Sequence, residues 1–144
     1  MINFDPEVDT TRTVRQWLED GRDLRRLLLA EETAAQTYLQ LSRQIQGKPS
    51  AMLQQMAREA HSQAACLEGI CLLATGEVPT IGTLPPETGD ATTLLRKCYG
   101  RAMRLLATYE ARRRDPEYGP VFVRLAEQQQ DHCRSIVEIL GRLP

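Results

Sequence analysis

The sequence predicts an all-α protein, and three observations support this prediction. Leu, Ala, Gln, Glu and Arg, which favour helix, dominate the 144 residues, whereas aromatic residues are few and runs of β-branched residues are absent. Apolar residues recur with helical periodicity through four long segments. Stretches that contain proline and glycine separate those segments, as expected for connections between helices.

A short helix is expected first, at about residues 10–19, with Val14, Trp17 and Leu18 on its apolar side. Four long helices are then expected at 21–46, 50–74, 91–114 and 118–141. The breakers "QGKPS" and "DPEYGP" are short, so each is expected to join antiparallel neighbours. We therefore divide the chain into an N-terminal segment, 1–20, and a single helical domain, 21–144.

The middle connection, 75–90, is longer and contains three prolines and three glycines. Sixteen extended residues reach about 50 Å, whereas a helix of 24 residues is about 36 Å long. The connection can therefore run the full length of the helices as a crossover, so that the third helix starts parallel to the second. A flexible linker between two separate hairpins is the alternative, but a lone hairpin could not bury these apolar faces.

A weak internal repeat relates the two halves of the chain. A shift of 69 positions places the second long helix on the fourth, so that Leu67 falls on Ile136. A shift of 71 places the first on the third, so that the Thr-Tyr pair at Tyr38 falls on the Thr-Tyr pair at Tyr109. The repeat predicts two similar hairpins that form one bundle.

Several polar side chains fall in the middle of the predicted apolar faces. They are Glu31, Gln63, Gln129, His132 and the hydroxyl groups of Tyr38 and Tyr109. A buried polar group without a partner costs about 1–3 kcal/mol, and a buried carboxylate costs more unless it is paired or protonated. A core built only for stability would not contain this layer.

With this pattern the chain resembles the ferritin-like superfamily, and most closely its rubrerythrin-type di-iron carboxylate proteins. The resemblance covers about 21–141 and implies a four-helix bundle of two antiparallel hairpins joined by a long crossover. It also implies one Glu on each of the first and third helices, often followed by a Tyr two turns later, and a Glu-x-x-His on each of the second and fourth. Parts of that pattern are present in this sequence. Glu31 and Tyr38 match the Glu and Tyr of the first helix, Tyr109 matches the Tyr of the third, and His132 matches the His of the fourth.

The same resemblance places the other four metal ligands at positions occupied by Ala60, Gln63, Ala102 and Gln129. Carboxylate and imidazole are the side chains that suit iron, and only Glu31 and His132 remain of six. We therefore expect a vestigial metal site, with no confident metal ligand, no catalytic residue and no cofactor. The alternative is a di-iron or manganese site.

Other potential ligands flank these positions. Glu59, His61, Glu110 and Glu127 are interpreted as flank or surface residues, although a shifted register that rescues a site stays open as an alternative. The cysteines have no CxxC spacing and are interpreted as reduced core residues; they are Cys66, Cys71, Cys98 and Cys133.

Composition limits the classes of function. The net charge of −1 gives no electrostatic reason to expect nucleic acid or a membrane surface. Neither a signal peptide nor an apolar run long enough to span a membrane is visible, so the cytoplasm is the expected compartment. The expected function is a non-catalytic binding or structural role, with a small-molecule or protein partner left open and a homodimer considered. The alternative is a metal-dependent oxidoreductase acting on peroxide or oxygen.

Overall fold

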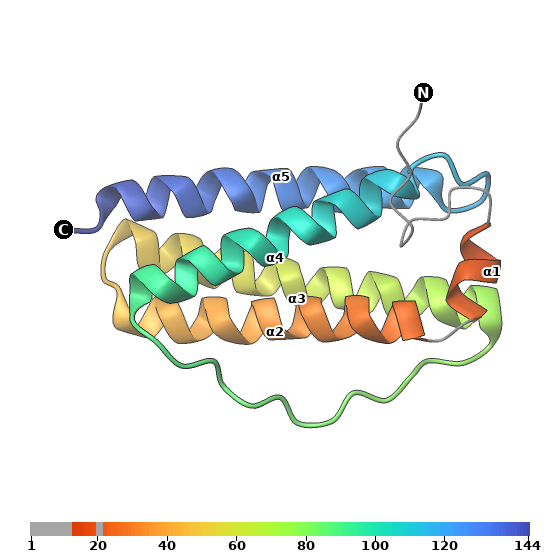
Figure 1. Cartoon of the computed structure of the whole chain (residues 1–144), viewed down its shortest axis with the longest axis horizontal. Helices are drawn as coiled ribbons and strands as arrows, with labels where there is room; N and C mark the ends of the chain where they lie inside the picture. Colours follow the sequence, from red (N-terminus) through yellow and green to blue (C-terminus); the bar gives the residue numbers. More distant parts are fainter. Residues whose placement is uncertain (1–12, 20–21) are drawn as a thin grey trace.

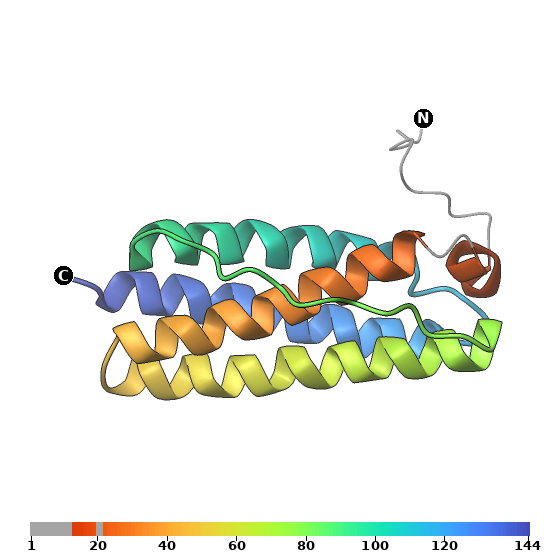
Figure 2. The same cartoon turned by 90° about the horizontal axis from the view of Figure 1, so that it is seen from below.

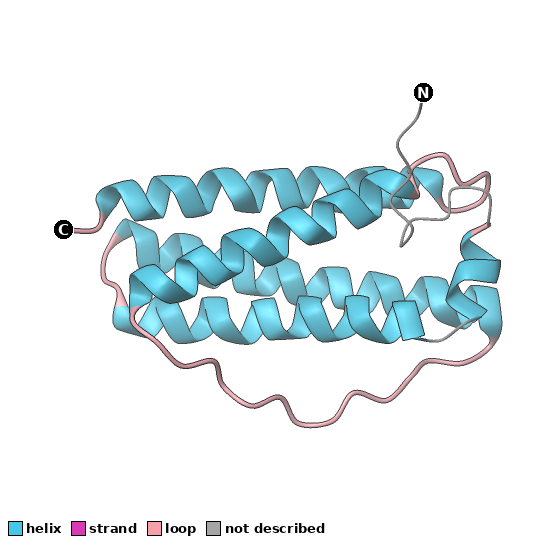
Figure 3. Ribbon diagram, viewed as in Figure 1, coloured by secondary structure: helices cyan, strands magenta, loops and turns pink. Residues whose placement is uncertain are grey.

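The computed structural model describes residues 13–19 and 22–144, and all regular secondary structure within them is helical (Figure 3). The prediction of an all-α protein is therefore confirmed. The helices are α1 (Val14–Glu19), α2 (Arg22–Gln44), α3 (Lys48–Thr75), α4 (Ala91–Ala111) and α5 (Gly119–Arg142). None of the helices in the described residues is long and apolar enough to cross a membrane.

The four long helices run alongside one another, and the short α1 lies across one end of them (Figures 1 and 2). α2 packs mainly on α3, and α4 packs mainly on α5; within each of these pairs the chain reverses direction. The connection 76–90 contains no helix and runs along the length of the molecule. As a result, α3 and α4 run in the same direction.

The connection 76–90 is held against α2 and α4 by polar contacts at Glu87. Its carboxylate accepts a hydrogen bond from the Thr37 hydroxyl at 2.6 Å. The same carboxylate forms an ion pair with Arg101 at 2.7 Å. Gln40 donates to the Glu87 carbonyl at 2.9 Å. These contacts, made by largely buried side chains, fix the path of the segment before α4 begins.

Local sequence sets the ends of the helices. Gly76 ends α3 in the left-handed region at φ 82° and donates its N–H to the Leu72 carbonyl, a conformation that glycine adopts without strain. Asp90 caps α4 by accepting the Thr93 N–H at 2.8 Å. Both residues belong to the connection expected at 75–90, and each satisfies a backbone group that a helix end leaves unpaired.

The end of α4 differs from the sequence-based expectation of 114, because the helix stops at Ala111. The next turn tightens through bonds from the Arg112 N–H to the Tyr109 carbonyl and from the Arg113 N–H to the Glu110 carbonyl. Asp115 then accepts hydrogen bonds from the backbone N–H groups of Tyr118 and of Val14 in α1. The early stop thus ties α1 to the turn before α5.

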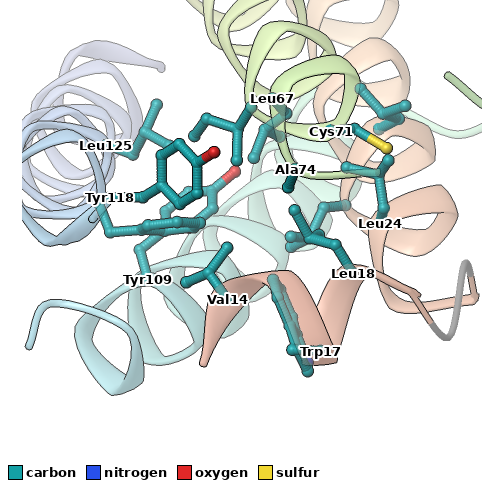
Figure 4. Close-up of a cluster of buried hydrophobic side chains, with 14 of the residues drawn as sticks. Val14, Trp17, Leu18, Leu24, Leu67, Cys71, Ala74, Tyr109, Tyr118 and Leu125 are labelled. Atoms are coloured by element: carbon teal, nitrogen blue, oxygen red, sulfur yellow. The ribbon is translucent and has the colours of Figure 1, made fainter. Parts of the chain in front are cut away.

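Two apolar clusters fill the interior. The end cluster lies beneath α1 and is shown in Figure 4; its buried members include Trp17, Leu18, Leu28, Ala64, Leu67, Leu105, Phe122 and Ala126. The far cluster occupies the other half and includes Ala34, Tyr38, Leu53, Ala60, Leu95, Cys98, Ile136 and Ile139. The expected apolar side of α1 is confirmed, since Val14, Trp17 and Leu18 are all buried.

Tyr99 lies at the edge of the buried face of α4. Tyr99 is 37% exposed, whereas the neighbouring Leu94 is fully buried. The buried stripe of α4 is centred on Cys98, Ala102 and Leu105, so Tyr99 falls at its edge, about 100° round the helix from Cys98.

Candidate functional site

All six positions singled out in the sequence are buried, and they come from all four long helices. Glu31 lies on α2, Ala60 and Gln63 on α3, Ala102 on α4, and Gln129 and His132 on α5. On α2, α3 and α5 the polar position falls between residues of the end cluster and residues of the far cluster: Glu31, for example, lies between Leu28 and Ala34. On α4 the corresponding position is the apolar Ala102. The polar side chains therefore form a layer that separates two apolar halves.

We call Glu31, Gln63, Tyr109 and Gln129 the central polar layer, because hydrogen bonds connect them. The Tyr109 hydroxyl donates to Glu31 Oε2 at 2.6 Å. Gln129 Nε2 donates to Gln63 Oε1 at 2.6 Å and lies 3.3 Å from Glu31 Oε2. Glu31 thus receives its hydrogen bonds from neutral groups of the protein itself.

Burial decides the protonation state of Glu31. Loss of water raises the pKa of this carboxyl group to about 8, against the lowering effect of the hydrogen bonds from Tyr109 and Gln129. At neutral pH the group is therefore a neutral carboxylic acid. Burial thus favours the neutral form of Glu31, whereas the hydrogen bonds from Tyr109 and Gln129 favour the ionised form and give its oxygens partners.

Gln63 is only partly satisfied. Its Oε1 accepts the bond from Gln129, but its Nε2 is buried and finds no acceptor in the part of the chain that the structure describes. Most buried polar atoms in proteins have a partner, so this donor is an exception that needs an explanation.

His132 forms a separate contact with Glu59 of α3. The distance between His132 Nε2 and Glu59 Oε1 is 3.0 Å, and the edge-on ring of Tyr38 lies 5.5 Å from the imidazole between ring centroids. From the sequence we interpreted Glu59 as a flank or surface residue. The structure corrects this interpretation, because Glu59 is 28% exposed and reaches inward to the histidine.

A signal for Glu59 was present in the sequence. Residues four apart on a helix lie on the same face, so Glu59 and Gln63 are neighbours on α3. Burial lowers the pKa of His132, and the contact with Glu59 counters that effect in part. The pair therefore holds a largely neutral imidazole beside a half-buried carboxylate.

The positions of Ala60 and Ala102 supply no ligand atoms. Both are almost completely buried, and Ala60 packs within the far cluster. Among residues 13–19 and 22–144, no three or more His, Cys, Asp or Glu side chains form a group that could hold a metal ion. The layer contains a single carboxyl group, Glu31, and it is engaged by Tyr109 and Gln129. The residues present do not fit a di-metal centre.

The remaining flank residues lie apart from the layer. His61 is exposed and contacts Glu32 at 3.2 Å, Glu110 pairs with Arg113, and Glu127 is exposed. The four cysteines are free thiols; Cys71, Cys98 and Cys133 are buried and Cys66 is half-buried.

Comparisons with known proteins identify no relative of this chain. The chain matches no protein-family model, no curated protein and no solved structure.

Proposed function

We propose that this chain is a ferritin-like four-helix bundle of the rubrerythrin type in which a hydrogen-bonded polar layer has replaced the di-metal site. Its role is then non-catalytic: it binds a small molecule or a protein partner, or it serves as a structural module. The wiring of the helices supports the first part of this proposal. Two antiparallel pairs and a connection along their length are the arrangement of the ferritin-like bundles.

One observation carries the proposal: the protein itself, through neutral donors, satisfies the carboxyl group that would be the first metal ligand. Tyr109 and Gln129 donate to Glu31, and burial keeps the proton on it near neutral pH. Gln129 contacts Gln63, its counterpart on α3, instead of pointing a carboxylate at a cation. The layer is stabilised by a proton and amide hydrogen bonds in the place where the resemblance expects metal.

The alternative, a metal-dependent oxidoreductase, has one observation in its favour. Glu59 brings a carboxylate to His132 that the simple alignment of positions did not anticipate. That pair supplies two ligands, and Glu31 is engaged with Tyr109 and Gln129 instead. We therefore favour the non-catalytic function.

Elemental analysis of the purified protein tests the proposal directly. The expected result is less than stoichiometric iron or manganese after growth with either metal. Two metal ions per chain, with turnover of peroxide or consumption of oxygen, would establish the oxidoreductase instead.

Restoring the site tests the assignment of its positions. A variant with Ala60→Glu, Gln63→His, Ala102→Glu and Gln129→Glu is expected to bind iron or manganese, so that its Tm rises with metal concentration. Without metal its added carboxylates repel one another and lower its stability. The matched control adds Glu31→Gln to these four changes and is expected to lose most of the metal binding. A folded fourfold variant that takes up neither metal would contradict the assignment.

A further inference from the structure

The side of the molecule between α3 and α5 contains a groove that the central polar layer borders. The groove has a volume of about 440 Å³, within the range of small-molecule sites. Its lining includes Glu59, Gln63 and Cys66 from α3 and Arg124 and Leu125 from α5. The groove therefore connects the outside of the molecule with the one polar side chain of the layer that is incompletely bonded.

Gln63 is the observation that points to a ligand. The side chain is 5% exposed, and its Oε1 is engaged by Gln129 in the interior. The planar amide then directs Nε2, the other branch, away from Gln129, and this donor has no acceptor among the described residues. A ligand in the groove that offers an oxygen acceptor would complete the hydrogen bonds of the layer.

Three charged side chains line the groove: Arg58 and Glu59 on α3, and Arg124 on α5. Arg58 donates to Gln55 at 2.7 Å. Arg124 lies toward Cys66, since its positive charge counters the rise that burial causes in the pKa of that thiol. The guanidinium of Arg124 forms no hydrogen bond or ion pair within the described part of the chain. Glu59 lies seven residues before Cys66, about 10 Å away along α3, and is already engaged by His132.

Gln63 lies between Glu59 and Cys66 along α3, so an acceptor bound to it also comes within the reach of Arg124. Arginine prefers carboxylate and phosphate groups, because its donors match their oxygens. Val121 and Leu125 give the groove an apolar wall beside Arg124. The recognised group is thus an oxyanion attached to a short apolar body.

We propose that the groove between α3 and α5 binds a small monocarboxylate, with one oxygen on Gln63 Nε2, the charge on Arg124, and the apolar chain along Val121 and Leu125. This inference deepens the proposed function, because it gives the binding role a site and a ligand class. A phosphate dianion fits less well, because the two arginines of the groove, Arg58 and Arg124, are offset in part by the carboxylate of Glu59 and leave the net positive charge of a site for a monoanion.

The test is a titration of the full-length protein with three probes of equal length: hexanoate, hexanamide and hexylammonium. The readout is the NMR signal of the Gln63 side-chain amide, together with ligand-observed binding. Hexanoate is expected to bind with one-to-one stoichiometry and to shift that signal. Hexanamide, which lacks the charge, is expected to bind at least tenfold more weakly, and hexylammonium is not expected to bind.

Two variants and a control locate the site. Gln63→Leu keeps the size of the side chain but removes the donor, and Arg124→Gln removes the charge; each is expected to weaken hexanoate binding at least tenfold. Arg134→Gln alters another exposed arginine of α5, one that pairs with Asp131 and lies outside the groove, and is expected to leave binding unchanged. Circular dichroism confirms that each variant is folded.

Three results would overturn the inference. They are equal affinity for hexanoate and hexanamide, binding of hexylammonium in preference to hexanoate, and undiminished hexanoate binding by Gln63→Leu. The last result would mean that buried water satisfies the donor. A parallel titration with Mn²⁺ alone separates this inference from the proposed function. Stoichiometric Mn²⁺ binding would contradict the proposed loss of the metal site. If hexanoate does not bind and Mn²⁺ does not bind either, the monocarboxylate site is wrong and the proposed loss of the metal site stands.

Discussion

The end cluster and the central polar layer are buried to the same degree, but they differ in what holds them together. Phe122 in the end cluster is fully buried and packs against the rings of Trp17 and Tyr109, at centroid distances of 6.4 and 5.9 Å. Glu31 in the polar layer is equally buried, and its contacts are hydrogen bonds and a retained proton. Burial of apolar surface stabilises the first region, whereas the second must offset the loss of water around polar groups.

The comparison shows that burial alone does not measure a contribution to stability. A truncated apolar side chain leaves a cavity, whose cost depends on its volume. A replaced polar group removes both a hydrogen bond and a desolvation penalty, so that the net effect can have either sign. The two regions should therefore respond differently to mutation and to pH.

The largest effect is expected in the end cluster. Phe122→Ala removes a ring that packs between α1 and α4, and it should lower the free energy of unfolding by about 3–5 kcal/mol. Urea denaturation followed by circular dichroism measures this loss. Val123→Ala, at the exposed neighbouring position, serves as the control and should change stability by about 0.5 kcal/mol or less. A loss below about 1 kcal/mol for Phe122→Ala would mean that this cluster is loosely packed.

The contribution of the central polar layer to the free energy of unfolding should depend on pH. The pKa of Glu31 is raised from 4.5 in the ordinary case to about 8 in the folded protein, so the folded state binds a proton that the unfolded state has lost in this range. Stability due to Glu31 is therefore full below pH 4.5 and decreases as pH rises toward 8, by on the order of 1 kcal/mol per pH unit. Urea denaturation at a series of pH values measures the slope.

The matched variant for this slope is Glu31→Gln, which has a similar shape but cannot ionise. It should remove the decrease between pH 4.5 and 8 while leaving other titrations unchanged. The same slope in both proteins would show that Glu31 is not the group responsible.

Replacing the layer with apolar groups should have a smaller effect, in the opposite direction from Phe122→Ala. The changes Glu31→Leu, Gln63→Leu, Gln129→Leu and Tyr109→Phe together remove the bonded partners at once, so that no buried donor or acceptor is left behind. The free energy of unfolding at pH 7 should be equal to that of the wild type or about 1–3 kcal/mol higher. Tyr109→Phe alone is the control and should be destabilising, because it leaves Glu31 with fewer partners. A fourfold variant that is folded but has lost more than about 2 kcal/mol would show that the layer is required for stability.

The sequence was sufficient to predict the helices and the burial of the layer, because both follow from the periodicity of apolar residues and from Gly, Pro and Asp at the helix ends. Glu31, Gln63, Gln129 and His132 were placed inside correctly on that basis. The pairing of His132 with Glu59 was not predicted. A helical wheel places Glu59 at the edge of the apolar face of α3 but does not show that its side chain turns inward. The unsatisfied Nε2 of Gln63 also depends on which amide atom faces Gln129, a matter of side-chain orientation that residue spacing does not contain.

The smallest effect is expected at the Glu59–His132 pair, which lies between the buried layer and the open groove. Glu59→Gln removes the carboxylate that counters the effect of burial, so the pKa of His132, already lowered, should fall further. For a histidine with a lowered folded pKa, the unfolded state binds more protons, and stability is lost as pH falls from 6.5 through the folded value. The variant should therefore be less stable by no more than about 1 kcal/mol near pH 7 and should lose more than the wild type on acidification. NMR titration of the His132 ring protons measures the shift, with Glu127→Gln, an exposed carboxylate of α5, as the control. If Glu59→Gln leaves the His132 titration unchanged, the 3.0 Å contact between His132 and Glu59 does not persist in solution, and Glu59 then does not link His132 to the groove.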